Sequence, residues 1–261
     1  MSLNGALFHL HKITSIIFIS ACNPLLTARF ISLANKRRSV NTLLILRCYG
    51  HPDLCKRWQV QSLFYLQYMN YLAHAYLSFD DQSLIVGNMI ADYVKGKHWQ
   101  EYDPGIQQGI QLHRAIDTFT DTHPVTLAAR EYFQASCGRY SAVFIDIVYD
   151  HFLATDTSIF SERSLSAFTQ QIYRTVAQQH DILPPVFQQV FRHMQQHDWL
   201  YGYRLMDGIY KSFSGIVHRA KFLEVTADAP FEVLKQHYGE LADHYRTFFP
   251  ELVAFVKTYP H

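Results

Sequence analysis

From Met69 onward, apolar residues recur every three to four positions and hardly ever alternate with polar ones, which is the period of an α-helix. The clearest helix starts at Asp103, a good N-cap residue, with Pro104 at the first helical position, and runs to Thr120. Including a short opening turn over 71–77, the pattern predicts an all-α domain of about eight or nine helices, with helical segments at 83–94, 103–120, 124–135, 142–154, 164–179, 185–196 and 231–256.

Two details of these segments are open to test. Ser83 is the expected N-cap of the second segment, and Pro250 should interrupt the last one. Between them, five large residues repeat with helical spacing, which favours core packing and allows a pocket wall as the alternative: Trp199, Tyr203, Met206, Tyr210 and Phe213.

Residues 1–68 lack this period and differ in charge. They hold eight Lys and Arg against one acid, Asp53, whereas 15 basic and 21 acidic residues follow, so +7 precedes −6. We interpret 1–68 as an N-terminal extension, disordered or translated from a start assigned too far upstream, with the domain spanning 69–261 from Met69. The alternative is a lipoprotein signal ending at Cys22, after Ile19, Ser20 and Ala21.

Composition narrows the classes of function. A chain of 261 residues with 49% hydrophobic content can bury one good core. Only Cys137 lies beyond residue 68, so a disulfide framework is not expected and a cytoplasmic location is. No apolar run reaches the roughly 18 residues of a membrane span. The acidic body has no basic helix face, which argues against nucleic-acid binding.

Polar residues fall on the apolar side of several predicted helices. His113 and Asp117 continue the stripe of Ile106 and Ile110 at i, i+4, i+7 and i+11. Three further residues face inward in the same way: His74, Asp92 and Asp150. Buried carboxylates persist only when paired or metal-bound, and mixed imidazole and carboxylate ligands suit manganese, iron, zinc or magnesium. The alternative is structural, with Asp117 paired to Arg114 or Arg130.

Four motifs give a family resemblance: MNYLAHAYLS from Met69, GNMIADYVKG from Gly87, GIQLHRAIDTFTD from Gly109 and DIVYDHFLA from Asp146. They resemble the acyl carrier protein phosphodiesterases, distant relatives of the HD-type metal phosphohydrolases. The resemblance implies an all-helical, HD-like enzyme that uses Mn²⁺, with Mg²⁺ or Fe²⁺ as alternatives. It would hydrolyse the phosphodiester between 4′-phosphopantetheine and the carrier-protein serine, converting holo-carrier protein to apo-carrier protein.

The implied roles follow from the same resemblance. His113, Asp117, Asp92 and Asp150 would bind the metal, with His74 as a further ligand or support. His151 or His74 would assist proton transfer, and Arg114 would clamp the phosphate. Because HD enzymes place His and Asp side by side, the choice among Asp146, Asp150 and His151 as ligands stays open. An acidic carrier protein would need a basic patch, for which the candidates are Lys95, Lys97, Arg139, Arg204, Lys211, Arg219 and Lys221.

Two other functions compete. One is a metal phosphohydrolase acting on nucleotides or another small phosphodiester. The other is a non-catalytic helical module that binds an acidic partner, with its inward acids paired structurally.

Overall fold

The computed structural model describes residues 71–260. These residues lie within the second of the chain's two compact units, Trp58–His261. Helices make up nearly all of the described part, which contains no strand, so the prediction of an all-α domain is confirmed there. The predicted extension over 1–68 lies outside the described residues. No helix within 71–260 is long and apolar enough to cross a membrane.

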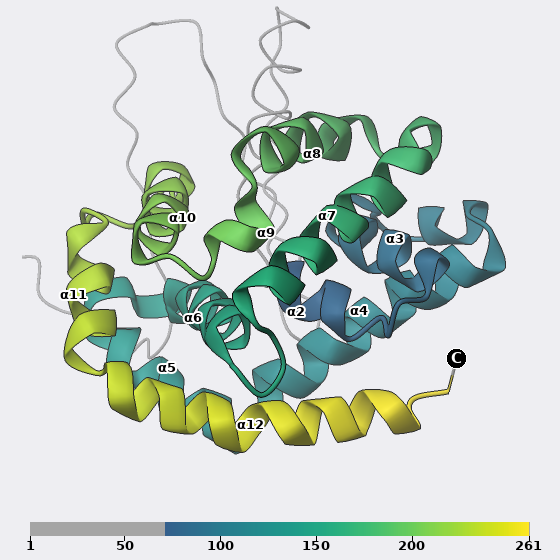
Figure 1. Ribbon diagram of the computed structural model, residues 1–261. Coiled ribbons are helices and arrows are strands. Elements are labelled where there is room, and N and C mark those ends of the chain that lie inside the picture. The colour runs from purple at the N-terminus through teal and green to yellow at the C-terminus, as the bar shows by residue number, and fades with distance from the viewer. Residues whose placement is uncertain (1–70, 261) are drawn as a thin grey trace, which may run out of the picture. The chain divides into compact units, whose positions relative to one another are not determined.

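The helices follow one another with short connections (Figure 1). Four 3₁₀ turns supplement them, of which η1 (Ala91–Tyr93) matters most below. The α-helices are α2 (Tyr71–Tyr76), α3 (Gln82–Ile90), α4 (Pro104–Thr122), α5 (Pro124–Cys137), α6 (Ser141–Thr155), α7 (Glu162–Gln178), α8 (Pro185–His197), α9 (Trp199–Gly202), α10 (Met206–Arg219), α11 (Asp228–Gln236) and α12 (Tyr238–Thr258).

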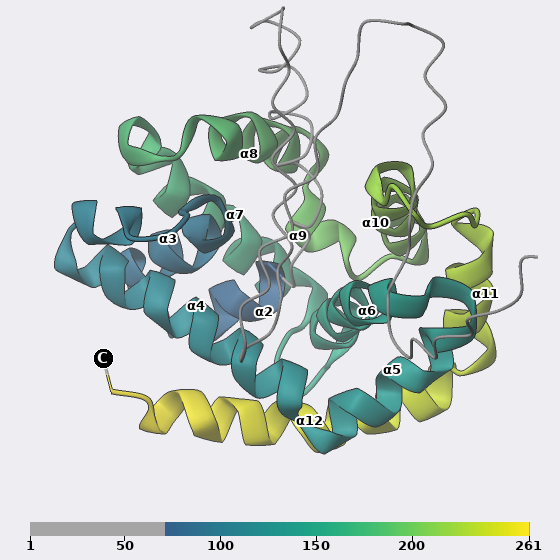
Figure 2. The same ribbon diagram turned by 180° about the vertical axis from the view of Figure 1, so that it is seen from behind.

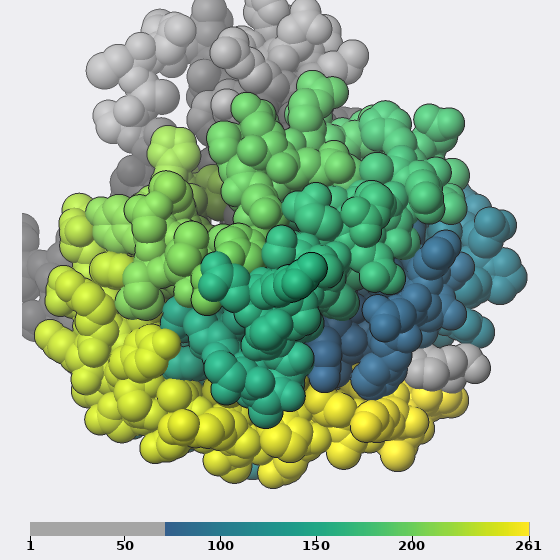
Figure 3. Space-filling model, in the orientation of Figure 1, coloured from purple at the N-terminus to yellow at the C-terminus, as the bar shows by residue number. Residues whose placement is uncertain are grey.

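Helix α6 lies in the middle of this unit. Its residues are apolar on nearly every side and mostly buried, and it contacts α2, α5, α10 and α12. The long helix α12 runs beside α4, α5 and α6 in both ribbon views (Figures 1 and 2). On the face shown in Figure 3, the blue α2–α3 stretch reaches the surface between α7 and α12. A helix buried by so many neighbours can hold polar side chains in a dry environment.

Helices α3 and α4 cross with their backbones in contact. A Cβ atom on Gly87 would lie 2.3 Å from the carbonyl oxygen of Ile106, and one on Gly109 would lie 2.6 Å from that of Leu84. Only glycine allows such an approach. The crossing brings the end of α3 close to the middle of α4, where His113 lies.

The start and end of α3 differ from the prediction. Asp81 is the N-cap residue, and its carboxylate accepts hydrogen bonds from the amides of Ser83 and Leu84. Ser83, the expected cap, is therefore inside the helix. The α-helix ends at Ile90 and tightens into η1. Asp103 does occupy the N-cap of α4, although its side chain makes no capping hydrogen bond.

The aromatic stripe packs in the core as predicted, with Tyr203 and Phe213 buried and Trp199, Met206 and Tyr210 partly buried against the core. It spans two helices, because α9 ends at Gly202 and α10 begins at Met206. A Cβ on Gly208 would lie 2.1 Å from the carbonyl oxygen of Gly202, so the two helices meet backbone to backbone.

The expected interruption at Pro250 was wrong, because α12 continues through this residue. Pro250 removes one helical hydrogen bond, and packing against α4, α5 and α6 compensates for the loss.

Candidate metal centre

Two histidines and one aspartate converge from α2 and α4. His74 Nε2 lies 3.3 Å from Asp117 Oδ1, and His113 Nε2 lies 3.4 Å from Asp117 Oδ2. One ligand atom from each of the three residues falls within 4.8 Å of the others. Asp92, on η1, adds a second carboxylate with Oδ1 at 3.6 Å from His113 Nε2. Four of the five predicted metal ligands are thus brought together. Figure 2 shows α2 directly behind α4 at this place.

A chain of hydrogen bonds fixes the orientation of His74. The hydroxyl of Ser78 donates to the His74 carbonyl at 2.9 Å, and the Asn88 amide nitrogen donates to the Ser78 oxygen at 2.9 Å. The Asn88 carbonyl oxygen therefore faces His74 Nδ1, 3.0 Å away. Because that oxygen can only accept, Nδ1 carries a proton, and Nε2 is directed at Asp117.

The donor atoms fit a divalent cation. His74 Nε2 and His113 Nε2 are buried and make no hydrogen bond within the described residues, although both face the Asp117 carboxylate. Buried nitrogen atoms in this state are suited to bind a cation. Ligands at about 2.0–2.2 Å from one ion lie about 3.0–3.4 Å from each other, close to the separations seen here. Imidazole and carboxylate donors without a thiolate suit Mn²⁺, Fe²⁺ or Mg²⁺ better than a structural zinc site.

Asp117 stays ionised at this position. Burial raises the pKa of its carboxyl, but the contacts to His74 and His113 outweigh burial and lower the pKa overall. Neither arginine considered as a partner contacts it. Arg130 pairs with Asp121, and Arg114 donates from Nη2 to the carbonyl oxygen of Val94 at 3.3 Å. The partners of Asp117 are therefore the two imidazoles.

Asp150 is placed differently from the prediction. Its side chain is fully buried, and its two oxygens accept hydrogen bonds from the amides of Leu72 and Ala73 at 3.0 and 2.8 Å. Burial raises the pKa of the Asp150 carboxyl, and the two amide donors oppose that rise. Asp150 thus caps the first turn of α2, the helix that carries His74. It binds two backbone amides, which is not the ligand role that the stripe on α6 suggested.

His151 also has partners outside the cluster. Its Nδ1 donates to the carbonyl of Tyr203 at 2.8 Å, and its Nε2 accepts from the hydroxyl of Tyr238 at 2.8 Å. Burial lowers the pKa of the imidazole, so the neutral form is favoured. With both nitrogens bonded, His151 ties α6 to the α9–α10 corner and to α12.

Comparison with known proteins now adds to this geometry. The chain matches the family model described as acyl carrier protein phosphodiesterase over residues 69–252. Acyl carrier protein phosphodiesterases from Salmonella agona, Salmonella dublin and Salmonella newport are each 33% identical to it over 187 residues, 71% of this chain and 96% of the relative. The chain belongs to the acyl carrier protein phosphodiesterase family. No solved structure matches it.

The family match spans every residue of the cluster, and it also spans neighbours that the sequence did not single out. Tyr71 and Tyr93 join their hydroxyls at 2.9 Å. Burial, Tyr93 and Asp92 raise the pKa of the Tyr71 phenol, which keeps it protonated. Tyr71 lies three residues before His74 and Tyr93 directly follows Asp92, so proximity to predicted ligands was the one signal available.

Asp146, left open as a ligand by the sequence, lies close enough to Asp117 for their charges to interact. Burial raises the pKa of its carboxyl, and the charges of Asp117 and Asp121 add to that effect while Arg130 opposes it. The ligand role of Asp146 stays a prediction.

Proposed function

We propose that this protein hydrolyses the phosphodiester that links 4′-phosphopantetheine to the serine of acyl carrier protein, releasing apo-carrier protein. Membership of the family supports this reaction, because relatives covered over 96% of their length carry that activity in their names. The observation that carries the proposal is the convergence of His74, Asp92, His113 and Asp117 at spacings that suit one cation.

We propose these four residues as the metal ligands and Mn²⁺ as the metal, with Mg²⁺ and Fe²⁺ as alternatives. A bound divalent cation supplies a water of lowered pKa and polarises the phosphoryl oxygens. The protein's own part is orientation. Asn88 holds the His74 ring in one tautomer, and the Gly87–Gly109 crossing sets the distance between η1 and α4.

We propose that the hydrogen-bonded pair of Tyr71 and Tyr93 delivers the proton to the departing serine oxygen. The Tyr71 and Tyr93 hydroxyls are hydrogen-bonded to each other at 2.9 Å beside Asp92, and the raised pKa of Tyr71 keeps this phenol protonated at neutral pH. His151, the earlier candidate, has both nitrogens engaged, and His74 presents Nε2 to Asp117. We therefore assign His151 to positioning.

Arg114 stays a proposed phosphate contact with a second role. Its side chain is exposed and reaches from α4 to the Val94 carbonyl, just past η1. One of its terminal nitrogens thus ties the Asp92 segment to α4. The remaining guanidinium N–H groups are donors that suit a non-bridging phosphate oxygen.

An acidic carrier protein would dock on Lys or Arg side chains that do not already form ion pairs with neighbouring acids. Two candidates are paired already, since Arg204 lies 3.0 Å from Glu162 and Lys211 lies 2.5 Å from Asp207. Arg139 stacks its guanidinium over Phe222, an aromatic ring that is 68% exposed. Such a cation beside an exposed ring suits a protein partner. We propose a cytoplasmic location, where carrier protein would be met.

One experiment tests this function. The full chain is incubated with holo-carrier protein and Mn²⁺, and the carrier protein is weighed by mass spectrometry. The expected result is loss of the mass of 4′-phosphopantetheine, abolished by EDTA. Release of product from nucleotides or bis(p-nitrophenyl) phosphate alone would favour a general phosphodiesterase. Absence of any turnover and of bound metal would favour a binding module.

A further inference from the structure

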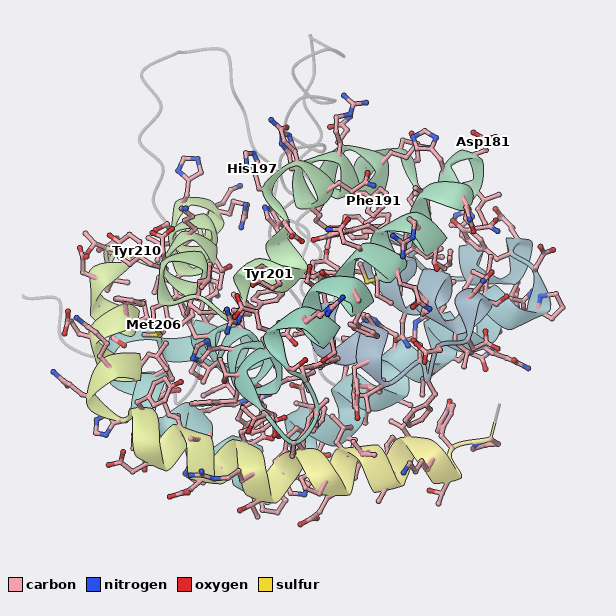
Figure 4. The ribbon with its side chains drawn as sticks, in the orientation of Figure 1. Asp181, Phe191, His197, Tyr201, Met206 and Tyr210 are labelled. Carbon is pink, nitrogen blue, oxygen red and sulfur yellow. The ribbon has the colours of Figure 1, made fainter. Side chains whose placement is uncertain are left out.

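A pocket of about 500 Å³ lies where α8, α9 and α10 meet, and no step described above uses it. Figure 3 shows the surface hollowed between α10 and the α8–α9 corner, and Figure 4 shows His197 at the end of α8 that adjoins this hollow. Pockets of about 300–1,000 Å³ are typical of small-molecule sites. Its size therefore admits a cofactor-sized chain.

Part of the lining of this α8–α10 pocket is apolar. Trp199, Tyr203 and Leu205 line it, with Leu205 47% exposed. Gly202 and Gly208 also line it, and a side chain on Gly208 would collide with the Gly202 backbone. The aromatic and aliphatic side chains suit methyl and methylene groups.

The polar groups of the pocket are mixed in kind. Lys211 and Arg219 can only donate hydrogen bonds, Asp207 can only accept, and the Ser212 hydroxyl donates to Gly208 at 3.0 Å and keeps lone pairs to accept. A fatty acyl chain would strip water from these charged groups without replacing their hydrogen bonds, which is costly. An uncharged chain bearing amides and hydroxyls matches both the donors and the acceptors.

Tyr203 connects this pocket to the metal centre. It is buried, and its carbonyl is held by His151 at 2.8 Å. Its side chain is near enough to Tyr71 to contribute to the raised pKa of that phenol. Tyr71 in turn bonds to Tyr93, the residue after Asp92. Tyr203 therefore lies between the pocket, which it lines, and the tyrosine pair beside Asp92.

We infer that the α8–α10 pocket binds the pantetheine arm of the substrate. This inference rests on the proposed function, which places the phosphate of the same prosthetic group at the metal centre. The arm is an uncharged chain with a gem-dimethyl group, a hydroxyl, two amides and a thiol. Trp199, Tyr203 and Leu205 pack against its hydrocarbon parts, Arg219 donates to a carbonyl oxygen, and the Ser212 oxygen accepts from an amide.

The test compares two serines on α10. Ser212 lines the pocket, and Ser214 does not; each donates to the carbonyl four residues earlier, at 3.0 and 2.8 Å. Ser212→Leu should fill part of the pocket, and Ser214→Leu is its matched control. Calorimetric titration of the full chain with pantetheine, which has no phosphate, should show affinity reduced at least about tenfold in Ser212→Leu only. The KM for holo-carrier protein should rise in parallel.

A second variant, Gly215→Ala, keeps the inference testable if Ser212→Leu does not fold. A methyl group at Gly215 would lie 2.7 Å from Arg219 Nη2, so Gly215→Ala displaces the guanidinium while favouring the helix. It should also weaken pantetheine binding. Equal affinity in wild type, Ser212→Leu and Gly215→Ala, or no heat of binding to wild type, overturns the inference. Failure of wild type to release phosphopantetheine refutes the proposed function instead, because the titration needs no turnover.

Discussion

The imidazole rings of His74 and His113 are stacked, with centroids 4.1 Å apart and planes inclined by 21°. Both Nε2 atoms are directed at the carboxylate of Asp117, at 3.3 and 3.4 Å. Histidine binds a metal through a ring nitrogen. The stack thus joins the ligands of two helices into one unit.

Asp117 is the residue on which both rings converge, and its loss should remove the centre. Asp117→Asn is expected to abolish metal-dependent release of 4′-phosphopantetheine without changing the helical circular dichroism. Mn²⁺ should raise the Tm of wild type, by an amount equivalent to about 2.7 kcal/mol at a hundredfold excess over Kd, and should not raise that of the variant.

The control for that variant lies one turn further along α4. Asp121 is exposed and pairs with Arg130. Asp121→Asn should keep both the activity and the Mn²⁺-dependent rise in Tm. Equal behaviour of the two variants would exclude Asp117 from the site.

Asn88 should matter for metal affinity although it is not a ligand. Asn88→Ala frees His74 to rotate and to change tautomer, because its Nδ1 loses an acceptor at 3.0 Å. Affinity for Mn²⁺ should fall about 10- to 100-fold, measured by titration of the EDTA-treated protein. Ser78→Ala, which removes the support of Asn88 and the bond to the His74 carbonyl but leaves the Asn88 contact to the His74 ring, should have a smaller effect; the reverse order would contradict this chain of hydrogen bonds.

The α3–α4 crossing should tolerate no side chain. Gly87→Ala forces the two backbones apart, since its Cβ would lie 2.3 Å from a carbonyl oxygen. The free energy of unfolding should fall by about 1–3 kcal/mol in urea denaturation, and Mn²⁺ affinity should fall with it. Gly239→Ala on α12, where a Cβ meets nothing within 4 Å, should be neutral or stabilising by up to about 1 kcal/mol.

Asp150 should affect stability before it affects chemistry. Asp150→Asn exchanges one acceptor oxygen for an NH₂ group facing an amide of α2, which should cost about 1–3 kcal/mol whether or not Mn²⁺ is present. Asp146→Asn is the matched variant one turn earlier, and it should cost less because the two α2 amides are bound by Asp150 and not by Asp146. A loss of Mn²⁺ affinity in Asp150→Asn that exceeds its loss of stability would restore Asp150 as a ligand.

His151 should make the fold sensitive to acid. Burial lowers its pKa in the folded state, so below about pH 6.5 the unfolded chain binds a proton that the folded protein excludes. The stability linked to His151 is therefore complete above that pH and declines as the pH falls toward the folded pKa. Urea unfolding from pH 7.5 to 5.0 should show a shallower decline for His151→Gln than for wild type. Parallel curves would count against a buried neutral imidazole.

The sequence predicted the helices and much of the centre because both depend on period. His113 and Asp117 share a stripe on one helix, and inward positions brought in His74 and Asp92. Periodicity reports burial, however, and does not identify a partner. Asp150 is buried as expected, yet its oxygens meet two backbone amides some 77 and 78 residues away in the chain. Such long-range pairing leaves no local signature.

Periodicity also fails to show where the chain turns in the C-terminal half. Helical spacing continues from Trp199 to Phe213 although the chain turns between Gly202 and Met206. That turn depends on two glycine backbones meeting, which only the assembled fold reveals. Pro250 was expected to break a helix that in fact continues, because tertiary contacts along α12 outweigh the local effect of proline.

Helix α2 has only six residues, too few to persist alone in water. Its first amides depend on Asp150, so His74 acquires a fixed position only after α6 has been made and has docked. All four proposed ligands precede α6 in the sequence, yet the position of His74 depends on a residue of α6.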